Sequence, residues 1–102
     1  MKMLTRKNLQ SLPPLGSQEG NPDPIAQVKF FTPDSGWTWY ATEFNPEEGR
    51  FYGWIDNGRE EGEFGYFTLS ELETARGPLG MKIERDTRFH PISLSMARKR
   101  GL

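Results

Sequence analysis

The stretch Trp37-Thr38-Trp39-Tyr40-Ala41-Thr42-Glu43-Phe44 decides the fold that this sequence predicts. It is rich in the aromatic and β-branched residues that favour strands. Side chains alternate along a strand, so the odd-numbered residues should share one face and the even-numbered residues the other. Aromatic rings would then lie on both faces, whereas a sheet with one face in water normally has a polar side. Either both faces are covered, or one aromatic face stays open for a partner.

Turn signals and further strands surround this stretch. The first strand is predicted over residues 25–32, and Thr32-Pro33-Asp34-Ser35-Gly36 supplies the residue types of a turn. Residues 51–56 and 64–67 read as the third and fourth strands. Asp56-Asn57-Gly58, between them, suits a hairpin turn of type I′. Strands joined in sequence by short turns predict an antiparallel meander.

Short helical segments flank the predicted meander. Thr5 can cap a helix over residues 6–12, and Thr68 and Glu71 form a capping box for a helix over 69–75. Residues 81–85 are a candidate fifth strand, and 93–99 a terminal helical turn. The expected class is α+β: a four- to five-stranded antiparallel meander with short flanking helices.

The length of 102 residues fits one domain. We expect a short helix and loop over residues 1–24, a single α+β domain over 25–92, and a basic C-terminal tail over 93–102. Twelve of the thirteen aromatic residues lie between Phe30 and Phe67. Because aromatic side chains bury the largest areas, this region should hold the core, with Trp37, Trp39 and Phe67 as its leading candidates.

Charge is distributed unevenly although the net charge is only −1. Residues 18–73 hold twelve acidic and three basic residues, a net charge of −9, whereas the two ends together carry +8. Such asymmetry bears on partners more than on fold. An acidic sheet suits a partner with a basic surface, and nucleic acid would have to meet the basic ends.

Several kinds of chemistry have no support in the sequence. The absence of Cys excludes disulfides and thiol chemistry, and with His90 as the one histidine it excludes the usual zinc ligand sets. No Gly-Lys-Ser or Gly-Lys-Thr marks a phosphate-binding loop, and we predict no cofactor. No stretch approaches the ~18 apolar residues of a membrane span, and no apolar signal region follows the basic start. We therefore expect a cytoplasmic protein without a membrane partner.

A longer set of motifs carries a resemblance to a known family. These motifs include Val28-Lys29-Phe30-Phe31-Thr32-Pro33-Asp34-Ser35, Trp37-Thr38-Trp39-Tyr40, Gly65-Tyr66-Phe67, Leu69-Ser70-Glu71-Leu72-Glu73 and Arg76-Gly77-Pro78-Leu79-Gly80. Over residues 4–89 the chain resembles the bacterial family called domain of unknown function 2958. The resemblance implies an accessory protein of plasmids and integrating elements, sometimes joined to DNA-processing domains. It implies no activity and no catalytic residue.

These observations favour a non-enzymatic interaction domain, encoded on a mobile element, that binds a protein such as a host defence or DNA-processing factor. The candidate partner-binding residues are Tyr40, Glu47, Glu48, Tyr52, Trp54, Glu60 and Glu61. One alternative is an accessory nucleic-acid-binding domain, for which the candidate residues are Lys82, Arg85, Arg88, Arg98, Lys99 and Arg100. Another is a small metal-dependent enzyme, in which the carboxylate pairs Glu47-Glu48, Glu60-Glu61 and Asp34 with Glu43 would bind Mg²⁺ or act as acid and base.

Overall fold

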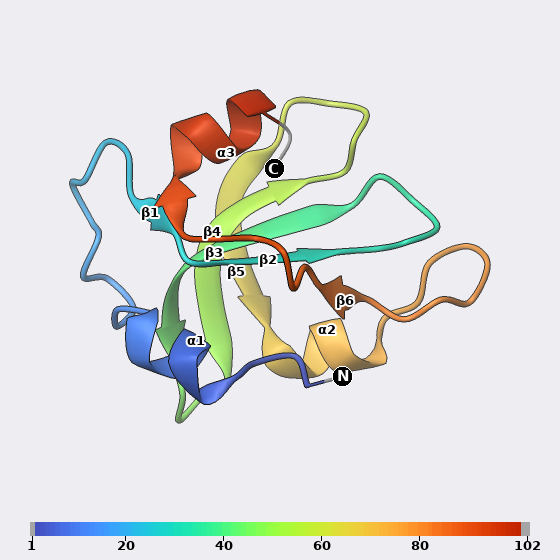
Figure 1. The fold of residues 1–102 in the computed structure, drawn as a ribbon, viewed down its shortest axis with the longest axis horizontal. Helices are drawn as coiled ribbons and strands as arrows, with labels where there is room; N and C mark the ends of the chain where they lie inside the picture. The colour runs from blue at the N-terminus through green and yellow to red at the C-terminus, as the bar shows by residue number, and fades with distance from the viewer. Residues whose placement is uncertain (1, 101–102) are drawn as a thin grey trace.

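The computed structural model describes residues 2–100, and one antiparallel sheet of five strands organises them (Figure 1). The order across the sheet is β5-β4-β3-β2-β6. These strands are β2 (Val28–Phe31), β3 (Thr38–Asn45), β4 (Arg50–Asp56), β5 (Glu63–Thr68) and β6 (Glu84–Arg85). A second, two-stranded sheet pairs β1 (Ile25–Ala26) with β7 (Ile92–Ser93). The helices are α1 (Arg6–Ser11), α2 (Leu69–Thr74) and α3 (Leu94–Arg100). The predicted α+β class is confirmed.

The four consecutive strands of the predicted meander are present, with two differences at the edges. The first predicted strand, residues 25–32, is divided, because β1 leaves the main sheet to pair with β7 while β2 stays in it. The fifth predicted strand is reduced to β6, which pairs antiparallel with β2. The predicted N-cap at Thr5 and the predicted capping box at Thr68 are both present, and Thr5 also forms a capping box with Asn8.

The inner face of the sheet carries the larger core. Phe51 lies at its centre, with ring centroids 5.5 Å from Phe30, 4.4 Å from Phe44 and 5.0 Å from Phe67. The remaining buried members of this cluster are Leu12, Val28, Ala41, Leu72 and Ile83. Each fully buried aliphatic or phenyl side chain stabilises the fold by about 1.5–3 kcal/mol, so this cluster is the main source of stability.

The outer face is only partly covered. A second cluster joins Tyr40 and Trp54 to Leu94 and Ala97 of α3, with Ala26 beneath them. Figure 1 shows α3 at the top of the molecule, away from α1 and α2 at the bottom. The described part of the predicted basic tail is therefore packed into the domain. Residues 101 and 102 of that tail, and Met1 of the predicted N-terminal segment, lie outside the described residues.

A β-bulge in β3 interrupts the predicted alternation of side chains between the two faces of the sheet. The register against β4 shifts between Ala41 and Glu43, which leaves Thr42 as the extra residue. Its hydroxyl donates a 3.0 Å hydrogen bond to the backbone oxygen of Tyr52. The extra residue moves Phe44 onto the inner face with Ala41 and moves Glu43 onto the outer face. The even-numbered and odd-numbered residues of this stretch therefore exchange faces at Thr42.

The three leading core candidates have different outcomes. Phe67 is buried, as predicted, and Trp39 is partly buried against the inner cluster. Trp37 is 43% exposed, so its assignment to the core is wrong. It lies just before β3, at the end of the β2–β3 turn. Its ring stacks on Trp39 at 5.7 Å, and in the described chain no further sheet residue lies past this end of β3 to cover its other side.

Close backbone packing holds the centre of the sheet together. A Cβ atom at Gly53 would lie 1.9 Å from the backbone oxygen of Tyr40 on the neighbouring strand. No side chain fits there, so glycine permits β3 and β4 to approach at this point.

Among residues 2–100, no helix is long and apolar enough to cross a membrane.

Candidate functional site

Three neighbouring rings of the outer face form what we call the outer aromatic patch: the half-buried Tyr52 and the exposed Phe64 and Tyr66. Tyr52 stacks on Phe64 at 5.6 Å with nearly parallel planes, and lies 4.9 Å from Tyr66. Phe64 is 42% exposed and Tyr66 is 63% exposed. The patch arises because β4 and β5 pair Tyr52 with Tyr66 and Trp54 with Phe64, which aligns their side chains on one face.

A groove runs between this patch and the loop of residues 16–24. Its volume is about 450 Å³. The loop contributes Gly16, Gln18 and Glu19, the patch contributes its three rings, and Thr42 and Glu43 of β3 complete the lining. A concave surface with aromatic walls and a few polar groups is typical of a binding site.

Glu43 fixes the position of the loop that borders the groove. Its carboxylate accepts 2.8 Å hydrogen bonds from the backbone N–H groups of Gly16 and Gln18. The residue is buried, and a buried carboxylate needs such partners because its charge has been removed from water. The bulge at Thr42 is what turns Glu43 toward the loop. Glu43 is therefore a positioning residue of the groove.

The environment of the groove raises the pKa of the Tyr52 hydroxyl above its ordinary value of 10.0. Burial is the main cause, and electrostatic interaction with the neighbouring Tyr66 and Glu43 adds to it. Tyr52 therefore remains a neutral hydrogen-bond donor and acceptor at physiological pH. It offers a partner a ring face and a hydroxyl.

Two of the predicted partner-binding residues lie under α3. Tyr40 is 4% exposed and Trp54 is 8% exposed. The guanidinium of Arg98 lies 3.6 Å above the Trp54 ring and 3.5 Å from a carboxylate oxygen of Glu61. The chain covers these rings because β1 and β7 pair and bring α3 over them. Correcting the predicted set, the structure excludes Tyr40 and Trp54 from the open part of the outer face.

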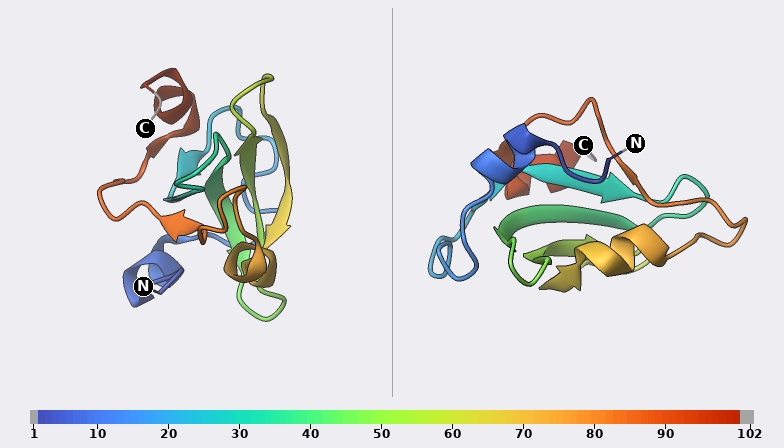
Figure 2. Two further views of the ribbon diagram at one scale, coloured as in Figure 1. Left: turned by 90° about the vertical axis from the view of Figure 1, so that its right-hand side faces the viewer. Right: turned by 90° about the horizontal axis from the view of Figure 1, so that it is seen from below.

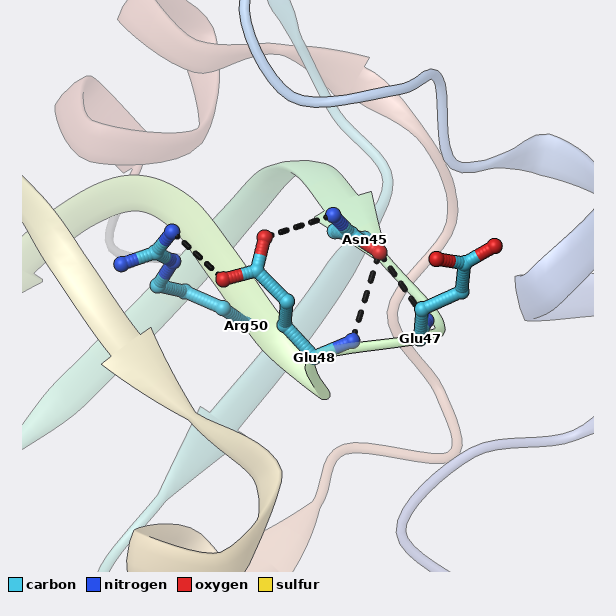
Figure 3. Close-up of polar contacts among 4 residues, drawn as sticks. All are labelled: Asn45, Glu47, Glu48 and Arg50. Carbon is cyan, nitrogen blue, oxygen red and sulfur yellow. Dashed lines mark hydrogen bonds and ion pairs between the residues drawn. The ribbon is translucent and has the colours of Figure 1, made fainter.

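The predicted acidic pair Glu47-Glu48 lies in the turn before β4, and its two members differ (Figure 3). Glu48 accepts a 2.8 Å hydrogen bond from the Asn45 amide and a 2.7 Å bond from the Arg50 guanidinium. The Asn45 side-chain oxygen accepts from the backbone N–H groups of Glu47 and Glu48. The Glu47 carboxylate points away from this network. Both residues are exposed, and only the Glu48 carboxylate takes part in these contacts.

The second acidic pair lies in the loop after β4. Glu60 is exposed, and its backbone N–H donates to the side chain of Asn57. Glu61 is paired with Arg98, as described above. The two acidic pairs therefore flank opposite ends of β4, and at ~3.4 Å per residue these ends are roughly 20 Å apart.

The basic residues proposed for nucleic acid do not form one patch. Lys82 and Arg85 lie at or beside β6, Arg88 follows in a turn, and Arg98, Lys99 and Arg100 belong to α3. Figures 1 and 2 place α3 and β6 in separate parts of the molecule. Arg98 is already engaged with Trp54 and Glu61, whereas Lys99 and Arg100 are exposed.

Residues 2–100 bring no group of three His, Asp or Glu side chains close enough to hold a metal ion. His90 is exposed and lies beside Pro91 and Asp86 on the wall of a shallow pocket. Within this part of the chain, the predicted carboxylate pairs lie at separate places, and no pair gains a third acidic or histidine side chain that would complete a metal site. No observation in residues 2–100 therefore supports the metal-dependent enzyme.

Sequence reasoning placed Tyr52 among the partner-binding residues and Glu43 only in a candidate carboxylate pair, and it missed Phe64 and Tyr66. Phe64 and Tyr66 alternate with Gly65 and Phe67, and this pattern could have placed them on the face opposite the core. Glu43 is an acidic residue inside an aromatic strand, which signals a buried polar contact. The loop of residues 16–24 carries no comparable signal, because its composition is that of any polar loop.

The fold and the groove define a small α+β domain with an open aromatic site on one sheet face. The chain belongs to the family described as Protein of unknown function (DUF2958), whose model matches residues 3–100. This match confirms the resemblance seen in the motifs. The comparisons with curated proteins and with solved structures give no match.

Proposed function

We propose that this chain is a non-enzymatic interaction domain that binds a protein partner through the outer aromatic patch and the groove beside it. The domain acts in the cytoplasm and is encoded on a mobile element, and its partner is a host defence or DNA-processing factor with a basic surface. One observation carries the proposal: Phe64 and Tyr66 are exposed, with the half-buried Tyr52 beside them, whereas α3 covers Tyr40 and Trp54 on the same face.

The composition of the patch supports protein binding. Tyrosine is enriched among the residues that dominate binding energy at interfaces, since its ring gives large contact area and its hydroxyl tolerates water. Tyr52 stacks on Phe64 and also contacts the tilted ring of Tyr66, so little side-chain entropy remains to be lost on binding. A clustered aromatic surface rimmed by polar groups marks an interaction site more often than scattered apolar residues do.

Charge supports a basic partner. Residues 18–73 carry a net charge of −9, and acidic turns lie at both ends of β4. A negative surface of this kind attracts a positive one and accelerates encounter, while it repels phosphate. The nucleic-acid alternative depends instead on exposed basic residues of its set, such as Lys82, Arg88, Lys99 and Arg100.

The test is capture of partners from host cytoplasm by the purified chain, after treatment with DNase and RNase. The site variant is Phe64→Ser with Tyr66→Ser. The matched control is Trp37→Ser, which removes an aromatic ring of similar exposure outside the patch. We expect the site variant to lose the captured protein and the control to keep it.

A charge variant separates the two candidate functions. Lys99→Ser with Arg100→Ser removes two exposed charges and leaves the buried Leu94 and Ala97 of α3 in place. Deletion of the segment after Phe89 is unsuitable, because it would remove those core residues. If the charge variant alone loses its partner and nuclease releases that partner, the nucleic-acid function replaces protein binding.

A further inference from the structure

We propose that the open edge of β5 binds an extended, basic segment of the partner as an added strand, with its Arg or Lys side chains over the outer aromatic patch. This inference rests on the proposed function and names the chemistry of the partner. It treats the edge and the patch as two parts of one site, because Phe64 and Tyr66 belong to both.

The two edges of the main sheet differ. β6 ends the sheet on one side with two residues, which is too short to template a further strand. β5 ends it on the other side with six residues, and in the described chain β5 pairs only with β4. Figure 2 shows β5, in yellow, at the margin of the sheet. Its sequence, Glu63-Phe64-Gly65-Tyr66-Phe67-Thr68, has neither the Lys nor the Pro that commonly protects an edge.

The backbone of Phe64 and Tyr66 faces outward from this edge. Along a strand, the N–H and C=O groups of successive residues point to opposite sides. Just after β5, the Leu69 N–H donates to the backbone oxygen of Gly49, the residue before β4, whereas the Thr68 N–H donates to the side chain of Glu71 in α2. Odd-numbered residues therefore bond to β4. Phe64 and Tyr66 present unpaired N–H and C=O groups to an incoming strand.

Charge selects the occupant of the edge. The segment 57–74, which contains β5 and its two flanks, holds five acidic residues and one basic residue. A basic peptide complements this net charge of −4. A second copy pairing through its own β5 would place two such segments side by side, and like charges opposite each other destabilise strand pairs. Phosphate chains are repelled for the same reason.

The outer face already binds cations of its own chain over its rings. Arg98 lies 3.6 Å from the centroid of Trp54, and Arg50 lies 5.4 Å from that of Tyr66. Such contacts are favourable because a ring face is electron-rich. An added strand projects every second side chain onto one face. Alternating basic residues of that strand would reach the open faces of Tyr52 and Phe64 as Arg98 reaches Trp54.

The probe is a capped heptapeptide of alternating Val and Arg. Its binding to the full chain is measured by fluorescence anisotropy at low and moderate salt and by amide chemical shifts. Two control peptides test the two halves of the proposal. One carries Glu in place of Arg, and the other is N-methylated at alternate amides, which removes strand hydrogen bonds and keeps the charge. We expect each control to bind at least about tenfold more weakly.

Two protein variants separate backbone from ring. Tyr66→Thr removes the ring and keeps the outward N–H, whereas Tyr66→Pro removes both. Proline is tolerated on an edge where the N–H faces solvent, so both variants should fold. Gly65→Pro is the contrasting variant, since it removes an N–H that bonds to β4, and its stability should fall. We expect Tyr66→Pro to bind the peptide about tenfold more weakly than Tyr66→Thr does.

Three results would overturn the inference. Equal binding of the N-methylated peptide would show charge attraction without an added strand. Equal affinity of the two Tyr66 variants would exclude the edge backbone. A dimer of the free chain that Tyr66→Pro dissolves would assign the edge to a second copy. These three results concern only the added strand and leave the proposed function in place. Failure of the proposed function would instead appear as unchanged partner capture by the Phe64→Ser, Tyr66→Ser variant.

Discussion

Glu43 and Gly16 lie 27 positions apart in the sequence, and the Gly16 N–H donates a 2.8 Å hydrogen bond to the Glu43 carboxylate. With the equivalent bond from Gln18, this contact holds the loop of residues 16–24 against β3. The contact exists because the bulge at Thr42 turns Glu43 outward. The position of one groove wall thus depends on a single irregularity in the central strand.

Replacing this carboxylate should loosen the loop and destabilise the fold. Glu43→Ala leaves two backbone N–H groups without their acceptor, and we expect a loss of about 1–3 kcal/mol in the free energy of unfolding. Urea denaturation measures it. Glu47→Ala, at an exposed position in a turn, is the control and should change stability by less than ~0.5 kcal/mol. Equal effects of the two variants would contradict the role assigned to Glu43.

The two stacked tryptophans should differ in their effect on stability. Trp39 packs against the inner cluster and is partly buried, so Trp39→Ala should cost about 2–3 kcal/mol, below the range for a fully buried ring. Trp37→Ala should cost under ~1 kcal/mol, because that ring is largely in water. Denaturation of both variants tests this order. A larger loss for Trp37→Ala would show that the turn before β3 is part of the core.

Substitutions of Asp34 and Gly77 should have non-additive effects on stability, because both remove the same contact between two loops. The Asp34 carboxylate accepts from the Leu79 and Met81 N–H groups and so joins the β2–β3 turn to the 77–81 loop, which Figure 1 shows at the same end of the molecule. A Cβ at Gly77 would lie 1.5 Å from an Asp34 oxygen. Gly77→Ala should displace that carboxylate and cost about 1 kcal/mol, as Asp34→Ala does. A double-mutant cycle should show that the losses do not add.

Acid should weaken the attachment of α3 through Asp23. The Ser95 hydroxyl and backbone N–H donate to the Asp23 carboxylate, at 2.6 Å and 2.9 Å, and lower its pKa below the ordinary 3.8. A lowered folded-state pKa gives stability that is present above pH 3.8 and lost as pH falls through the folded value. Unfolding of wild type and Asp23→Asn, compared across this range, measures it. The advantage of the wild type should shrink on acidification, and an advantage that grows would contradict the assignment.

Reversing the free turn charges should slow partner capture without harming the fold. Glu47 and Glu60 are the suitable positions, because Glu48 and Glu61 are paired with Arg50 and Arg98. Glu47→Lys with Glu60→Lys should lower the association rate for a basic partner, more strongly at low salt. Surface plasmon resonance with the captured protein measures that rate. A rate that is unchanged at low salt would exclude steering by these turns.

Much of the fold could be predicted from local chemistry. The turn residues at 32–36 and 45–49 and the aromatic strands between them define a meander with little ambiguity, and Thr68 with Glu71 marks the start of α2. The bulge at Thr42 could not be predicted, since one inserted residue leaves no trace in composition. The division of the first strand was also hidden, because β1 and β7 have two residues each and show no periodicity.

The candidate site could be predicted only as a set of aromatic residues. Which of these rings stay open depends on α3, and α3 is placed by the long-range pairing of β1 with β7. Tyr40 and Tyr52 are both tyrosines on the outer face, yet one lies beneath Phe89 and α3 and the other lines the groove. Nothing local to either residue distinguishes them.

Hydrogen–deuterium exchange of the chain, with and without its captured partner, tests the central claim most directly. If the outer aromatic patch and the β5 edge form the binding surface, the amides of Phe64 and Tyr66 and those of residues 16–20 will exchange more slowly in the complex. Lys82, Arg85 and Arg88 should keep their free rates. Protection of residues 82–88 and 98–100, with β5 unchanged, would contradict the account.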